Sequence, residues 1–302
     1  MKKRLLILLI TLSTGFSQAW ADGFSESYLS MGVQGGFGSL VFGGQGRSSQ
    51  PGSMYGFTIG YSVYLNDYVG FATGLHFDRL TCGYYETGVV SPGQGNVLVS
   101  DGVTWMNYNA IYHLVTDRVD ETYTSYFVEI PLLVSIRHNR WYWNMGLKVA
   151  LPVSMNVDFS YGESELYLDE ITTSGTVLAN PWHVKTYEGS TGKADLFDKH
   201  RSQLGTTYMM ASFELGYNLA FYSNASSLTM GAFVDMSLNG AKLNNASNTA
   251  TMTLNTDVLS YHSTVLTDKV NSVSCFKVGF NLKYNLGVGQ KAQRSTRGKR
   301  YL

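Results

Sequence analysis

The amino-acid sequence predicts an all-β fold, an eight-stranded antiparallel up-and-down transmembrane β-barrel with long extracellular loops. Three observations lead to this prediction. Large apolar and small polar residues alternate in eight segments, the connections between the segments are by turns short and long, and a secretory leader precedes them. A period of two indicates strands whose two faces meet different surroundings.

The predicted strands cover residues 29–37, 54–65, 68–80, 122–137, 140–157, 207–222, 228–238 and 272–286. In the second strand Phe57, Ile59 and Val63 share one face, whereas Gly56 and Thr58 lie on the other. A soluble barrel would carry charged side chains outside, but here the second face is mostly Gly, Ser, Thr and Asn, which suit a narrow interior. We therefore expect the apolar face to contact lipid, with Trp141, Trp143, Phe221, Tyr222 and Tyr284 at one membrane interface.

Short connections follow the second, fourth and sixth strands, and long ones of about 10, 40, 50 and 30 residues follow the first, third, fifth and seventh. Short turns are typical of the periplasmic side, so both termini are expected there, in the outer membrane of a Gram-negative bacterium. Residues 103–115 and 249–259 also alternate, which indicates hairpins above the membrane and leaves a ten-stranded barrel as the alternative.

Residues 1–21 have the three parts of a signal peptide: a basic start, a short apolar run and a small-x-small cleavage site. Residues 22–287 then form one barrel domain and residues 288–302 a basic periplasmic tail. Of the 22 basic residues, three lie in the leader and five in the tail, so the body holds 14 basic against 22 acidic residues. This balance argues against a nucleic-acid partner, and no spacing indicates a metal or cofactor site.

Charged residues in the inward phase predict a layer halfway along the lumen. A turn at His138-Asn139 would set Glu129 opposite Lys148, and a turn at residues 224–225 would set Glu214 opposite Asp235. The layer comprises His76, Asp78, Glu129, Lys148, Glu214, Asp235 and Lys277. Such side chains would close the lumen of an eight-stranded barrel. Either these charges satisfy one another, or they form a gate or proton-linked site.

Other residues stand out singly. Cys82 and Cys275 fall near one rim of the barrel and form a candidate disulfide, although their strands are not neighbours.

Pro131 and Pro152 each remove a ladder hydrogen bond, which predicts a bulge or kink. The aromatic residues of the external loops are candidates for recognition of a protein or glycan, or else pack the loops together: Trp105, Tyr108, Tyr112, Trp182 and Tyr187.

Two runs carry a family resemblance: residues 126–133, Tyr-Phe-Val-Glu-Ile-Pro-Leu-Leu, and residues 146–152, Gly-Leu-Lys-Val-Ala-Leu-Pro, together with Thr73-Gly74-Leu75. They resemble the small outer-membrane barrels of Bacteroidetes, the PorT-like or OmpA-like barrel group. The chain lacks the peptidoglycan-binding domain of OmpA proper, so the resemblance does not imply wall anchoring. Similarity to PorT would imply a role in protein secretion.

These observations predict a non-enzymatic barrel with outer-membrane lipids as partners, contributing to envelope integrity or to surface binding through its loops. A narrow channel or a subunit of a secretion or assembly machine is the alternative. A lipid-modifying enzyme is a further one, although His113, His183, His200 and His262 show no triad spacing. The sequence leaves the oligomeric state open.

Overall fold

The computed structural model describes residues 26–44, 49–100, 105–171, 176–197, 204–220, 226–243, 251–255, 258–267 and 269–288. The predicted signal peptide and all of the basic tail beyond residue 288 lie outside these residues. None of the described helices is long and apolar enough to cross a membrane.

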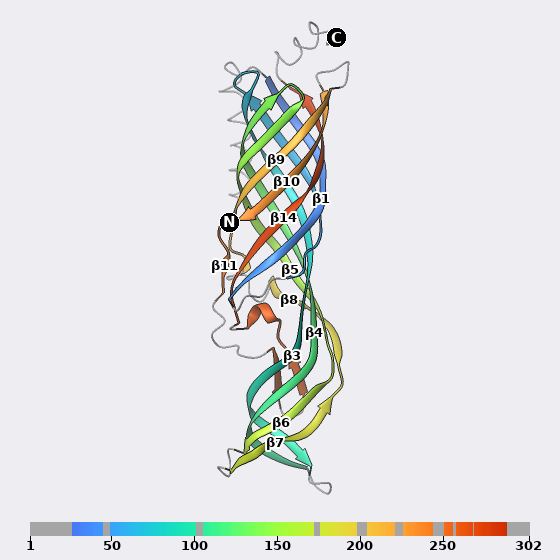
Figure 1. The fold of residues 1–302 in the computed structure, drawn as a ribbon, viewed down its shortest axis with the longest axis vertical. Coiled ribbons are helices and arrows are strands. Elements are labelled where there is room, and N and C mark those ends of the chain that lie inside the picture. The colour runs from blue at the N-terminus through green and yellow to red at the C-terminus, as the bar shows by residue number, and fades with distance from the viewer. Residues whose placement is uncertain are drawn as a thin grey trace, which may run out of the picture.

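Eight antiparallel strands close into a ring, as the sequence predicts (Figure 1). In ring order they are β1 (Glu26–Gly44), β2 (Gly52–Tyr64), β3 (Val69–Ser100), β4 (Trp105–His138), β5 (Trp141–Tyr161), β9 (Tyr208–Ala220), β10 (Ser226–Ser237) and β14 (Val270–Gly287). The last strand pairs with the first, and β4 pairs with β5, so none of the eight has a free edge within the barrel.

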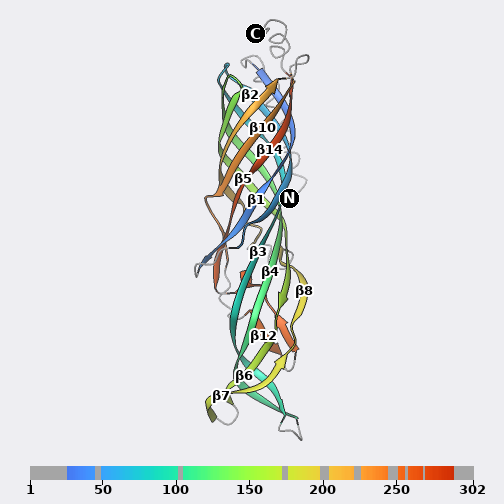
Figure 2. The same ribbon diagram turned by 45° about the vertical axis from the view of Figure 1, so that its right-hand side comes forward.

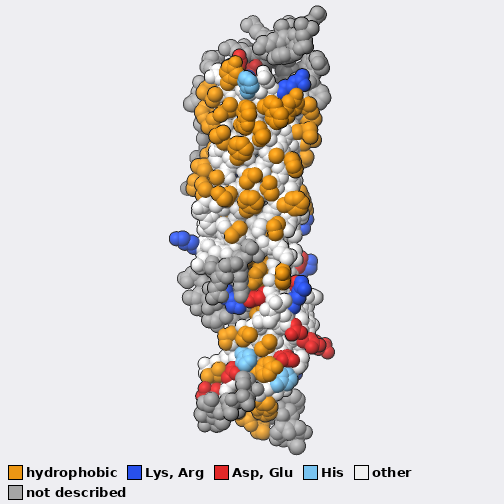
Figure 3. Space-filling view, viewed as in Figure 1, with side chains coloured by type: hydrophobic (Ala, Val, Ile, Leu, Met, Phe, Trp, Pro, Cys, Tyr) orange, Lys and Arg blue, Asp and Glu red, His pale blue; other side chains and the backbone are white. Residues whose placement is uncertain are grey.

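The two faces of each strand meet the surroundings that the alternation predicts. Along β14, Phe276, Val278 and Phe280 are exposed on the outside, whereas Lys277 and Asn281 are buried in the lumen. On the face of the molecule shown in Figure 3, exposed hydrophobic side chains are spread over the barrel half, and the other barrel strands expose such side chains as well. This outer surface fits lipid, because a soluble protein rarely exposes a continuous apolar patch of this extent.

Aromatic side chains mark both ends of the apolar belt. At one end Tyr55, Arg79 and Tyr126 are cross-strand neighbours, and the Arg79 guanidinium lies 5.3 and 6.0 Å from the two ring centroids. At the other end Trp141 packs edge-on against Tyr217, with ring centroids 5.3 Å apart. Aromatic girdles at the two interfaces are typical of transmembrane barrels. Of the predicted girdle, Phe221 and Tyr222 lie outside the described residues.

Beyond the barrel, β3 and β4 continue as one long hairpin, which makes the molecule elongated (Figures 1 and 2). We call the sheet outside the belt the blade: the outer parts of β3 and β4 with β6 (Ser164–Ile171) and β7 (Thr176–Tyr187). The described residues also form four short strands and one 3-10 helix: β8 (Ser190–Asp195) on β5, β11 (Ala241–Lys242) on β14, the hairpin of β12 (Met252–Asn255) with β13 (Val258–Tyr261), and η1 (Thr264–Leu266). Of the two predicted outer hairpins, the described part of residues 103–115 extends the main sheet as part of β4, whereas residues 249–259 contribute to the separate two-stranded sheet of β12 and β13. Among the described residues, neither enlarges the ring to ten strands.

The predicted register of β4 with β5 is wrong by two residues. The turn consists of Asn139 and Arg140, with Asn139 at φ 56°, a left-handed conformation that Asn tolerates better than most residues. Glu129 consequently faces Ala150, and Lys148 faces Pro131. A shift of two keeps every side chain on its predicted face, because the strand period is two.

The predicted register of β9 with β10 is also wrong by two residues. Glu214 faces Phe233, and Asp235 faces Ser212 on one side and Lys277 on the other. Two carboxylates directly opposite each other repel, and the observed register separates them.

A bulge or kink was predicted at both prolines, and the structure has a bulge at Pro152. Tyr126 pairs with Ser154 and Phe127 with Pro152, so Val153 is the extra residue on β5. Pro131 keeps its place in the ladder opposite Lys148.

Candidate functional site

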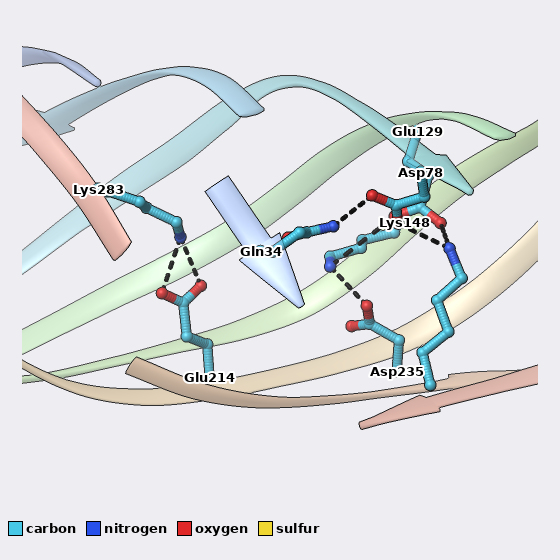
Figure 4. A network of polar contacts seen from close by, with 8 residues as sticks. Gln34, Asp78, Glu129, Lys148, Glu214, Asp235 and Lys283 are labelled. Atoms are coloured by element: carbon cyan, nitrogen blue, oxygen red, sulfur yellow. Dashed lines mark hydrogen bonds and ion pairs between the residues drawn. The ribbon is translucent and has the colours of Figure 1, made fainter. Parts of the chain in front are cut away.

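The structure buries all seven residues of the predicted charge layer in the lumen: His76, Asp78, Glu129, Lys148, Glu214, Asp235 and Lys277. The centre of the layer is Lys277, whose ammonium contacts the carboxylates of Asp78, at 2.7 Å, and of Glu129. Lys148 donates to Asp235 Oδ2 at 2.6 Å and lies 3.9 Å from Glu129 Oε2 (Figure 4). The lysines thus join carboxylates from β3, β4 and β10 across the lumen.

The local sequence makes room for this layer. Gly56 lies opposite Asp78 in the sheet, and a Cβ at Gly56 would come within 2.1 Å of an Asp78 carboxylate oxygen. Gln34, which is not among the residues predicted for the layer, donates from Nε2 to Asp78 Oδ1 at 2.5 Å. Its place in the inward phase of the first predicted strand is the signal that could have found it.

Three carboxyl groups, of Asp78, Glu129 and Asp235, face two ammonium groups at the centre of the layer. Glu129 Oε2 and Asp235 Oδ1 accept no hydrogen bond among the described residues. His76 is next to Glu129 in the sheet, yet its Nδ1 also lacks a partner there. The layer therefore holds two satisfied lysines and spare acceptor atoms in a closed space.

Glu214 belongs to a separate group nearer the short turns. Lys283 Nζ donates to both Glu214 oxygens, at 2.7 and 2.8 Å, and the Tyr142 hydroxyl donates to Oε1 at 2.7 Å. Tyr142 lies across Gly216, where a Cβ would come within 2.4 Å of its ring. Lys283 and Tyr142 were missed, although both stand in the inward phase of predicted strands.

An apolar core fills the lumen on the blade side of the charge layer. It combines barrel side chains such as Leu40, Phe127 and Tyr208 with Phe197 and Val265 from the long connections. Cys82 and Cys275 are both buried in this core as free thiols, so the candidate disulfide is not formed. With the charge layer, this core closes the lumen at two successive levels.

A buried carboxylate attaches one long connection to the barrel rim. Glu121 on β4 accepts hydrogen bonds from the hydroxyls of Tyr123 and Tyr261 and, at 2.7 Å, from the backbone N–H of Thr264. Tyr261 also stacks on Phe159, with ring centroids 3.9 Å apart. Five residues beyond the belt residue Tyr126, Glu121 lies outside the membrane-spanning part, and burial raises the pKa of its carboxyl above the ordinary value.

The predicted loop aromatics differ in their exposure. Trp182 is exposed, but Tyr112 is buried and bonds to both backbone groups of Leu254 through its hydroxyl. Tyr108 and Tyr187 pack against the small core beneath the blade. Tyr112 is therefore not available for recognition, because it holds β12 against the blade, and the Trp105 side chain lies outside the described residues.

On the outer face of the blade, rings from neighbouring strands form a row. His113 stacks on Tyr167 at 5.2 Å, Tyr167 meets His183 at 5.3 Å, and His113 Nδ1 lies 2.9 Å from the Asp169 carboxylate. An Asp-oriented His can serve as a base only if a nucleophile meets its other nitrogen, and the hydrogen bonds of the described residues bring none there.

The closed ring, the apolar belt and the lumen closed by side chains define the class of this protein, a transmembrane β-barrel carrying a sheet extension. No protein-family model matches the chain, and no curated protein matches it.

Solved structures with similarity to the chain include three bacterial proteins. The attachment invasion locus protein Ail of Yersinia pestis, in complex with the heparin analogue sucrose octasulfate, is 9% identical, covers 85% of this chain and 99% of its own, and has a TM-score of 0.28. Neisserial surface protein A is 9% identical, with the match covering 85% of this chain and 95% of that protein, and has a TM-score of 0.27. The outer membrane protease OmpT of Escherichia coli is 6% identical, with the match covering 87% of this chain and 97% of that protein, and has a TM-score of 0.27.

Proposed function

We propose that this protein is a non-enzymatic barrel of the outer membrane, which anchors the blade at the cell surface and conducts no solute. The observation that carries the proposal is the lumen, closed by the charge layer and again by the apolar core. An eight-stranded barrel has an interior just wide enough for side chains. With the lumen closed, the surface outside the cell that is left for specific contacts is the blade and its connections.

The blade supports surface binding by its construction. It stands on the two longest strands of the barrel and has its own core of buried residues beneath β4 and β6. Binding residues are often presented on such segments by a rigid scaffold. Trp182 and the row of His113, Tyr167 and His183 offer rings there for a protein or glycan ligand. On the resemblance of residues 126–133 and 146–152, we also propose that the protein is a member of the PorT-like or OmpA-like barrel group.

Conductance in planar lipid bilayers tests the closed lumen. The full mature chain, inserted from detergent, should add no stepwise current, whereas a porin inserted by the same protocol supplies the positive control. Regular steps from the wild-type chain would contradict the proposal and favour the alternative of a narrow channel.

Deletion of the gene tests the cellular role. Loss of an envelope component should raise sensitivity to bile salts and detergents, and the wild-type gene should restore resistance. Normal resistance combined with a defect in secreted proteins would favour the alternative of a secretion-machine subunit.

A further inference from the structure

A single cation interrupts the lipid-facing surface of the barrel. Among the strand residues that the structure describes between the two aromatic girdles, Arg79 on β3 is the only Lys, Arg, Asp or Glu in the outward phase. Other charged residues of the same strands, such as Asp78 and Lys277, lie in the lumen. A charge that faces lipid is costly unless it reaches the membrane interface or finds a counter-charge. Arg79 therefore lacks the compensation that the lumen gives to the other charges.

Arg79 lies at the boundary between lipid and water. One row towards the middle of the belt, Phe57 pairs with Phe77, and both side chains are exposed. One row towards the blade, the outward pair is Thr81 with Thr124. The outer surface thus changes from aromatic rings to hydroxyl groups across Arg79, and such a boundary is typical of the level at which lipid headgroups lie.

Two tyrosines hold the guanidinium at this level. Tyr55 and Tyr126 are its cross-strand neighbours, and their rings lie within the range of a cation–π contact. Arg79 Nη1 donates to the Tyr55 hydroxyl, and Nε is buried. Nη2 is the remaining nitrogen, and it is neither buried nor bonded among the described residues. The protein fixes one side of the cation and leaves Nη2 for a ligand.

The ligand that Arg79 lacks is an anion. Arg118 makes the comparison, because its guanidinium also lies 5.3 Å from a tyrosine ring, that of Tyr85, but donates twice to the Asp120 carboxylate at 2.6 Å. Arg79 has the aromatic contact, but no carboxylate of the described residues pairs with it. Arginine binds phosphate through strong charge-assisted hydrogen bonds. At the level of the headgroups, the phosphate of a membrane lipid is the anion within reach.

We propose that Arg79 binds a phosphate group of a lipid in the leaflet on the blade side. With the blade outside the cell, this leaflet consists of lipopolysaccharide, and the group is a phosphate monoester of lipid A. Nη2 and the hydroxyls of Thr81 and Thr124 donate to the phosphate oxygens, while an acyl chain lies along Phe57 and Phe77. The identity of the lipid rests on the proposed orientation, which cysteine labelling of intact cells tests separately.

Native mass spectrometry of the full mature chain tests the site. The barrel is kept in lauryldimethylamine oxide, which contains no phosphate, and is titrated with diphosphoryl lipid A and with its dephosphorylated form. We expect a complex with the first lipid and at least about tenfold weaker binding of the second, since a charge-assisted hydrogen bond is lost. Millimolar inorganic phosphate should not displace lipid A, because the free ion gains nothing from the apolar surface.

Three variants locate the binding. Arg79→Gln removes the charge and should weaken lipid A about tenfold to a hundredfold, the value of one hydrogen bond to a charged group. Arg79→Lys keeps the charge without the planar fork and should recover part of this loss. Arg118→Gln is the matched control and should bind as the wild type does, because Asp120 already neutralises Arg118. Heat-dependent mobility in gels confirms that each variant has folded.

Four results would overturn the proposal. The absence of any complex with lipid A would show that there is no site. Equal binding of the two forms of the lipid would mean that only the acyl chains are held. Unchanged binding by Arg79→Gln would place the phosphate elsewhere on the barrel. Displacement by inorganic phosphate would make the site one for free anions, without a preference for lipid.

Discussion

At the scale of single residues, the lumen depends on two lysines that water does not reach. Lys277 is fully buried and Lys148 nearly so, and each is bound to carboxylates of other strands. A buried ion pair adds little net stability, because both charges lose their hydration. Removing one partner is different, since it leaves the opposite charge buried and uncompensated.

Replacement of Lys277 by Met should therefore destabilise the barrel strongly. Asp78 and Glu129 would lose their shared ammonium, and we expect the free energy of unfolding to fall by about 3–5 kcal/mol. Urea unfolding of the barrel in lipid vesicles, followed by tryptophan fluorescence, measures the change.

Lys193→Met is the matched control for this prediction. Lys193 also faces a carboxylate, Asp158 at 3.2 Å, but its side chain is 83% exposed. Exposed pairs contribute at most about 1 kcal/mol. A loss in Lys277→Met no larger than in Lys193→Met would show that the lumen charges are not mutually dependent.

Glu121 predicts a pH dependence in the connection that it holds. Burial raises the pKa of Glu121 in the folded state above its pKa in the unfolded chain. The contribution of Glu121 to stability is therefore fully present at a pH below the unfolded-state pKa and is lost as the pH rises through the folded-state pKa. Hydrogen-exchange protection of residues 258–267, corrected for intrinsic rates, should thus increase when the pH is lowered from 7 towards 5. Protection that falls over this range would contradict the assignment.

Glu121→Gln provides the comparison for the pH experiment. The amide keeps the size of the side chain but does not titrate, so the difference in protection between the two pH values should shrink. Tyr261 keeps its stacking on Phe159 in this variant, which holds the connection in place for the measurement.

At the scale of elements, the turn of the β4–β5 hairpin sets the register of two long strands. Asn139 occupies the left-handed region, which costs most other residues about 1–2 kcal/mol. Once this residue is placed, the pairs from His138–Trp141 to Phe127–Pro152 follow without a break. One side chain at the turn thereby decides where Lys148 lies relative to Glu129.

Asn139→Val should lower the free energy of unfolding by about 1–2 kcal/mol, because a β-branched residue disfavours positive φ. Asn139→Gly, which adopts this φ freely, should change it little. Urea unfolding of the two variants side by side measures both values. Equal stability of the Val and Gly variants would mean that the turn does not require a left-handed residue.

At the scale of the whole molecule, the fold places the blade and the short turns at opposite ends of the apolar belt (Figures 1 and 3). The described chain ends join the short-turn end, where Tyr28 pairs with Gly287. A barrel inserted with its short turns in the periplasm then carries its blade outside the cell. Both native thiols are buried, so an introduced cysteine can report on either end.

Labelling of intact cells with a bulky maleimide-polyethylene glycol tests this orientation. Val258→Cys, at an exposed site beyond the belt, should react at once, whereas His138→Cys, beside a short turn, should react only after the outer membrane is permeabilised. The wild-type chain is the unlabelled control. The opposite pattern would reverse the orientation and place the short turns at the cell surface.

The sequence predicts much of the fold but little of which side chains contact one another inside the lumen. The phase of every barrel strand follows from local alternation, so the inward positions of Lys277 and Asp78 are predictable from the sequence alone. The register is not, since both predicted registers were wrong by two residues and nothing in the alternation distinguishes shifts of two.

The sequence by itself determined the class of this protein, because a period of two over eight segments is a local property that each strand carries alone. Only the tertiary structure decided which charges meet. Lys277 and Asp78 are 199 residues apart, and they touch because the ring brings β3 and β14 to face each other across a narrow lumen. Contacts of that kind depend on closure and register together, which no single segment encodes.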